Sequence, residues 1–118
     1  MQYNKTLLMG RLTRDPEKRD TGKSSVTNFV LAVNRDYKSD DGEVKTDFVP
    51  IDIWGKSGEN ALRLLKKGSA VLIDGSLRID SVKKNDEYTN FIKVVADKFQ
   101  LLDKKEDRKT AVFERTSS

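Results

Sequence analysis

The stretch TDFVPIDIW, residues 46–54, decides the fold class of this chain. Side chains alternate between the two faces of a β-strand. One face, expected to point into a core, carries Val49, Ile51 and Ile53. The other face carries Phe48, Pro50, Asp52 and Trp54. Aromatic rings at both ends of a face with a carboxylate between them are not typical of a core. The pattern therefore predicts a strand with one buried face and one exposed aromatic face.

Working outward, residues 57–67 carry leucines and an alanine at near-helical spacing. Ser57 is the expected N-cap, Lys66 and Lys67 suit the last turn, and Gly68 suits the position after the helix. Turns are expected at 14–17, 21–25, 40–42 and 83–87. Apolar runs predict strands at 6–12, 26–34, 46–54, 70–79 and 88–99.

The resulting order is three strands, one helix and two strands. This is the order of the OB-fold, an all-β, five-stranded barrel with one helix between strands three and four, which binds oligonucleotides or oligosaccharides. An open α+β sheet has the same order, so the pattern alone leaves that alternative open.

Composition limits the chemistry. The 118 residues fit one domain, expected at 1–102, and a short charged tail at 103–118 without a clear apolar period, expected to be disordered. The net charge of +4 permits a polyanionic partner. The chain has no Cys and no His, which excludes disulfides, the usual zinc sites and triads that need histidine. We expect no cofactor and no metal. With no membrane-length apolar run and no secretion signal, we expect a cytoplasmic, nucleoid-associated protein.

Exposed rings need a reason, and base stacking supplies one. Packing in an oligomer is the alternative for Phe48 and Trp54. Tyr37 lies just before the hairpin that leads to Phe48, where local packing is its alternative role. Basic residues lie among these rings and after the first strand; they include Arg11, Arg14, Lys18, Arg19, Arg35, Lys38, Lys45 and Lys56.

An ordered series of motifs resembles the bacterial single-stranded DNA-binding proteins. The series comprises MGRLTRDPE at 9–17, VTNFVLAVN at 26–34, TDF at 46–48, WGK at 54–56, LKKGS at 65–69, DGSLR at 74–78 and VVAD at 94–97. The resemblance covers roughly residues 1–102. It implies an OB-fold, sequence-independent binding of single-stranded DNA in replication, recombination and repair, and a homotetramer, with no enzymatic activity.

The resemblance also implies site residues. The stacking rings carried over are Tyr37, Phe48 and Trp54, and the basic contacts are Arg11, Arg19, Arg35, Lys56 and Arg78. A fourth ring of the family falls on Val82, with Tyr88 across the loop. The last residues, AVFERTSS at 111–118, lack the family's acidic Pro-Phe tip, so recruitment of replication and repair proteins through a tail is not assumed.

Two other functions are weighed. A replication-restart accessory protein of the same fold would act mainly through protein contacts and bind DNA weakly. A hydrolase could use Asp47 and Asp52 near the aromatic face, but no motif pairs them with a nucleophile or metal cluster.

Overall fold

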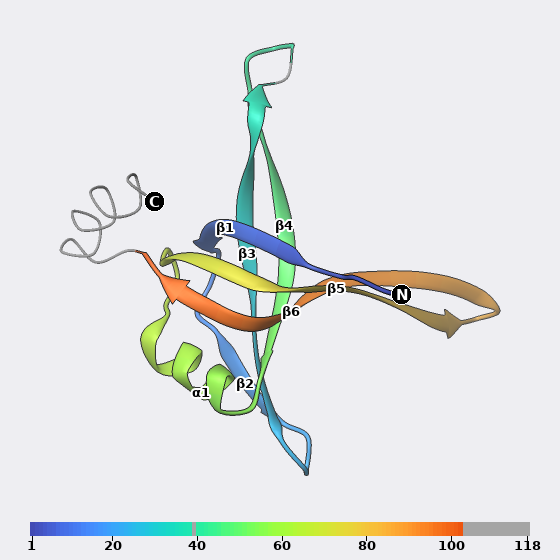
Figure 1. Cartoon of the computed structure of the whole chain (residues 1–118). Helices are drawn as coiled ribbons and strands as arrows, with labels where there is room; N and C mark the ends of the chain where they lie inside the picture. The colour runs from blue at the N-terminus through green and yellow to red at the C-terminus, as the bar shows by residue number, and fades with distance from the viewer. Residues whose placement is uncertain (39, 103–118) are drawn as a thin grey trace.

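Strands dominate the computed structural model, which describes residues 1–38 and 40–102, without the side chains of Tyr37 and Lys38. The expected tail, 103–118, lies outside the described residues. Within them, six strands and one helix follow in the order β1 (Thr6–Leu12), β2 (Glu17–Asp20), β3 (Ser25–Lys38), β4 (Val44–Trp54), α1 (Gly55–Leu64), β5 (Ala70–Lys84) and β6 (Glu87–Leu101) (Figure 1).

Five of the strands close into a barrel. Neighbouring strands follow the order β1-β5-β6-β4-β3-β2, and a further pairing of β1 with β3 joins Arg11 to Ala32 and closes the ring. The pairing of β4 with β6 is parallel, and the others are antiparallel. This arrangement confirms the predicted OB-fold barrel and excludes the open sheet.

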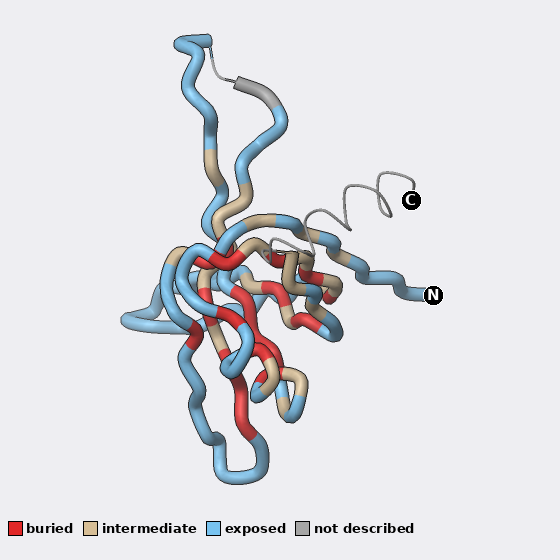
Figure 2. The backbone as a smooth tube through the Cα atoms, turned by 90° about the vertical axis from the view of Figure 1, so that its left-hand side faces the viewer, coloured by how far each residue is buried: buried red, intermediate tan, exposed pale blue. Residues whose placement is uncertain are grey.

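The core follows the alternation seen in the sequence. Ile51 and Ile53 are fully buried, and Val49 packs against the core from a half-buried position. Phe29 and Leu31 of β3 and Val94 of β6 fill the barrel beside them. Buried residues gather in the barrel, whereas the hairpins that project from it are exposed (Figure 2).

The helix begins and ends earlier than the sequence predicted. It starts at Gly55, whose φ of +66° favours glycine, and it has Trp54 as an N-cap without a side-chain hydrogen bond. Ser57 is therefore not the cap. Leu65 follows the helix, so Lys66 and Lys67 lie beyond the last turn. Gly58 is buried, and a Cβ there would clash with the carbonyl oxygen of Ile53. Glycine thus lets α1 pack tightly on the end of β4.

The strand β2 was not predicted. Its sequence, EKRD, is wholly charged and exposed, so it shows no apolar alternation. Its first residue, Glu17, was also assigned to the turn expected at 14–17. The strand forms because it pairs with the start of β3, from Glu17 opposite Asn28 to Asp20 opposite Ser25. It adds an edge strand beside the barrel.

Two hairpins project from the barrel as long ribbons (Figure 1). The β3–β4 ribbon has a register shift between Asn34 and Lys38, and Gly42 at its tip has a φ of +83°. The β5–β6 ribbon continues in regular register to Lys84 opposite Glu87, well past the predicted strand end at residue 79. Asn85 and Asp86 both have positive φ, as a two-residue hairpin turn requires.

Candidate nucleic-acid interface

We define the outer face as the side of β4 that points away from the core. Its ends are aromatic, as predicted: Phe48 is 64% exposed and Trp54 is 43% exposed. The two rings lie six positions apart on an extended strand, a separation of about 20 Å. Asp52 lies between them and is largely buried. The outer face thus offers two rings on one rigid strand, at a spacing that a flexible polymer could span.

The register brings two predicted basic residues alongside these rings. Arg19 pairs with Val26, which pairs with Trp54, so the three residues form one row across β2, β3 and β4. A second row runs from Phe48 through Ala32 to Arg11 of β1. Directly paired residues point to the same side of a sheet. Both arginines therefore belong to the outer face.

The environment of Arg11 is partly fixed by the barrel. One of its guanidinium nitrogens donates to the carbonyl oxygen of Gly68 at 2.8 Å. A hollow of about 390 Å³ opens beside it, with Met9, Ala32 and Asn34 in its lining. Arg11 is thus held at the edge of a surface depression.

A charged bridge joins β4 to the β5–β6 ribbon, and the sequence analysis missed it. The Nζ of Lys93 lies 3.0 Å from Oδ2 of Asp52 and 3.7 Å from Oδ2 of Asp80. Asp52, with a side chain only 12% exposed, is thereby neutralised between the two rings. A carboxylate that would repel a polyanion is instead paired, so the outer face stays open to phosphates.

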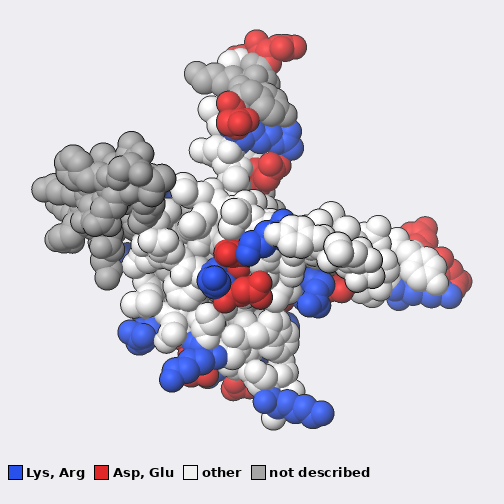
Figure 3. All heavy atoms as spheres, in the orientation of Figure 1, with Lys and Arg blue, Asp and Glu red and all other residues white. Residues whose placement is uncertain are grey.

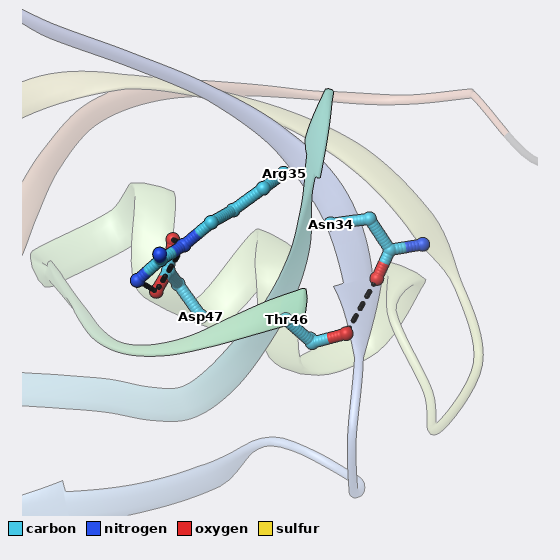
Figure 4. A network of polar contacts seen from close by, with 4 residues as sticks. All are labelled: Asn34, Arg35, Thr46 and Asp47. Carbon is cyan, nitrogen blue, oxygen red and sulfur yellow. Dashed lines mark hydrogen bonds and ion pairs between the residues drawn. The ribbon is translucent and has the colours of Figure 1, made fainter. Parts of the chain in front are cut away.

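Arg35 lies on the reverse face of the β3–β4 ribbon. Its guanidinium binds Asp47, with the ion pair at 2.9 Å, while Asn34 and Thr46 meet on the opposite side through a 2.8 Å hydrogen bond (Figure 4). Alternation puts Phe48 with Thr46, away from Arg35. The hydrogen bond from Arg35 lowers the pKa of Asp47 below its ordinary value. The structure therefore does not bring Arg35 together with Phe48.

The other two predicted basic contacts, Lys56 and Arg78, are exposed on the surface. Arg78 lies opposite Lys93 on the β5–β6 ribbon, and Lys56 lies in the first turn of α1. Neither these two nor Arg19 makes an ion pair with another described residue. In the view of Figure 3, basic groups lie apart from one another and acidic groups mark the tips of both ribbons. On the face shown, positive charge is thus scattered and not gathered in one patch.

The other predicted rings differ in placement. The backbone of Tyr37 lies in β3, but its side chain is outside the described part of the structure. Val82 is 46% exposed and shares a face with Arg78. Tyr88 pairs with Lys83 and so points to the opposite face, where the Nζ of Lys83 lies 5.9 Å from its ring centroid. Tyr88 cannot stand in for a ring at Val82.

Other kinds of site have little support. Among the described residues, no cluster of three or more His, Cys, Asp or Glu side chains could hold a metal ion. No described helix combines the length and apolar character that crossing a membrane requires. Asp47 and Asp52, the two carboxylates considered for hydrolysis, both form ion pairs. The described surface thus favours binding over catalysis.

Comparison with known proteins gives a consistent result. The model of the single-strand binding protein family matches residues 3–102. A "Single-stranded DNA-binding protein 3" of Listeria innocua is 39% identical over 106 residues, which are 88% of this chain and 66% of that protein. A "Single-stranded DNA-binding protein" of Halalkalibacterium halodurans is 41% identical over 102 residues, 85% of this chain and 61% of that protein.

A third relative is similar in length. The "Single-stranded DNA-binding protein 1" of Clostridium acetobutylicum is 36% identical over 107 residues, which are 88% of this chain and 97% of the relative. The chain therefore spans about two thirds of the first two relatives and nearly all of the third.

Proposed function

Since the chain belongs to the single-strand binding protein family, we propose that it binds and protects single-stranded DNA without sequence preference during replication, recombination and repair. The observation that carries the proposal is the pair of exposed rings, Phe48 and Trp54, on a strand whose other face forms the core. The role is non-enzymatic. The protein would act in the cytoplasm, in association with the nucleoid, through the OB-fold domain of residues 1–102.

Two interactions contribute to the free energy of DNA binding: base stacking and contacts with phosphates. Each base that stacks on a ring contributes roughly 1–3 kcal/mol, whatever its identity, because every base has a π-face. Lys and Arg side chains replace counterions along the backbone, so affinity falls as salt rises, with a log–log slope of about −0.7 per neutralised phosphate. Duplex DNA is discriminated against because its bases are already stacked on one another.

Most of the proposed contacts lie on or beside the outer face. There, bases stack on Phe48 and Trp54, and phosphates meet the basic residues Arg11, Arg19, Lys56 and Arg78. Stacking on Tyr37 is proposed from the family resemblance alone. The contact predicted for Arg35 stays a prediction. The guanidinium of Arg35 is bound to Asp47. It reaches a phosphate only where the single-stranded DNA also follows the reverse face of the β3–β4 ribbon.

We also propose assembly as a homotetramer. Support comes from apolar side chains that are exposed in the described part of the chain, each by more than 40%: Leu7, Met9, Leu77, Ile79 and Ile92. Such side chains commonly mark protein–protein interfaces. Light scattering of the pure protein measures the mass directly. Recruitment through a tail is left out of the proposal, because residues 103–118 lie outside the described part.

The decisive experiment is a titration of Trp54 fluorescence with oligothymidylate at two salt concentrations. Trp54 is the single tryptophan of the chain, so the signal comes from the site itself. We expect quenching at low salt and weaker affinity at high salt. Absence of both quenching and binding would contradict the proposal. Weak DNA binding with tight binding to a replication protein would instead favour the accessory role.

A further inference from the structure

The two faces of the β5–β6 ribbon differ in chemistry. In antiparallel strands, directly paired residues share a face. One face carries the pairs Leu77–Val94, Ile79–Ile92, Ser81–Asn90 and Lys83–Tyr88. The other carries Arg78–Lys93, Asp80–Phe91 and Val82–Thr89. The first face is mainly apolar toward the barrel, whereas the second combines charges with one aromatic ring, Phe91.

The face of Phe91 is continuous with the outer face of β4. In the parallel pairing of β4 with β6, Ile51 lies beside Val94, and both are buried in the core. The next pair, Asp52 and Val95, therefore points outward. Lys93 shares that side and reaches Asp52, an ion pair that fixes the orientation independently of the alternation. Phe91, two residues before Lys93, projects from the same side as Phe48 and Trp54.

We propose that Phe91 is a further base-stacking platform, supplying on β6 the ring that Val82 does not supply on β5. Its side chain is 56% exposed. At about 3.3 Å per residue, it lies roughly 13 Å along the ribbon from Val95, where β6 passes Asp52. Arg78 stands between it and the barrel and can meet a phosphate that flanks a stacked base. The inference rests on the proposed function.

Packing against a second copy of the chain accounts less well for this ring. The neighbours of Phe91 on its face are Asp80, Lys93 and Thr89, and burying charged groups in an interface is costly. The opposite face of the β5–β6 ribbon carries Leu77, Ile79 and Ile92, and we call it the reverse face of this ribbon. It is the face suited to apolar packing. We therefore assign the apolar part of the reverse face, at Leu77, Ile79 and Ile92, to assembly, and the face of Phe91 to DNA.

The test compares Phe91→Ala with Tyr88→Ala, which removes an exposed ring from the reverse face of the same ribbon. The ligand is an oligothymidylate of about 10 nucleotides, within the span of one OB-fold. We expect Phe91→Ala to bind about 5- to 100-fold more weakly than the wild type. Tyr88→Ala should bind within about twofold. Phe91→Leu, which keeps apolar bulk without a ring, should lose affinity as Phe91→Ala does, and Phe91→Trp should retain it.

The outcomes separate the two proposals. If the wild type does not bind the oligonucleotide, the proposed function fails. If it binds and Phe91→Ala binds equally well, only the role of Phe91 is overturned. A change in mass by light scattering for Phe91→Ala would also overturn it, because the ring would then belong to the assembly. In Trp54→Phe with Phe91→Trp, DNA should quench the introduced indole; in Trp54→Phe with Tyr88→Trp it should not.

Discussion

The two ribbons that leave the barrel are built differently. The β3–β4 ribbon is held by polar contacts on both sides, with Arg35 bound to Asp47 on one and Asn34 bound to Thr46 on the other. The β5–β6 ribbon has an apolar reverse face that the described residues leave exposed, with Ile79 57% exposed and Ile92 53% exposed. The described polar side chains near the base of the first ribbon bind one another, whereas the second ribbon presents the apolar face that we propose to be covered in the assembly. The difference predicts that substitutions on the two ribbons affect different properties.

The largest effect is expected from breaking the apolar reverse face. Ile79→Glu with Ile92→Lys removes two apolar side chains at directly paired positions, keeps the net charge and can form a cross-strand ion pair. We expect the ribbon to persist and the assembly to fall apart into smaller species. Light scattering measures the mass. The matched control on the other ribbon is Val44→Glu, which replaces a half-exposed apolar residue and should leave the mass unchanged. An unchanged mass for the double variant would remove this face from assembly.

The next effect concerns the rings at the two ends of the outer face. Trp54→Ala and Phe48→Ala should each weaken binding of oligothymidylate by about 1–3 kcal/mol, because each removes one stacking platform. Polarisation of a labelled oligonucleotide measures both, since Trp54→Ala abolishes the intrinsic signal. The mass should stay that of the wild type. Unchanged affinity for Phe48→Ala alone would confine DNA to the Trp54 end and away from the β3–β4 ribbon.

A comparable effect, on stability and not on DNA binding, is expected at the bridge between the β5–β6 ribbon and β4. Lys93→Ala leaves Asp52 largely buried without its cation, so we expect the free energy of unfolding to fall by about 1–3 kcal/mol. Urea denaturation measures the change. The control is Lys83→Ala on the same ribbon, whose ion pair with Asp86 is long and exposed and should contribute little. Equal stability of the two variants would mean that the bridge does not hold the ribbon to the barrel.

The sequence predicted what depends on local patterns. Alternation gave the core side of β4 and the exposure of Phe48 and Trp54. The element order allowed a barrel or an open sheet, and the family resemblance favoured the barrel. It missed β2, because four charged residues form a strand only through pairing with β3. It also missed Lys93 and the pairing of Arg35. The partner of Lys93 lies on a strand that joins β6 in parallel, and the partner of Arg35 depends on hairpin register, so neither follows from nearby residues.

The smallest effect is expected at the ion pair of the β3–β4 ribbon, and it should depend on pH. The pKa of Asp47 is lowered from its ordinary value of 3.8 by the hydrogen bond from Arg35. A carboxyl group whose pKa is lower when folded stabilises the fold above its unfolded pKa, and the stabilisation is lost as pH falls through the folded pKa. Asp47→Asn should therefore be slightly less stable than the wild type at neutral pH, and the difference should vanish in acid. Urea midpoints at neutral and acidic pH measure this. A difference that persists in acid would mean that Asp47 acts through packing and not through charge. The ion pair between Arg35 and Asp47 would then not be one of the polar contacts that hold the β3–β4 ribbon.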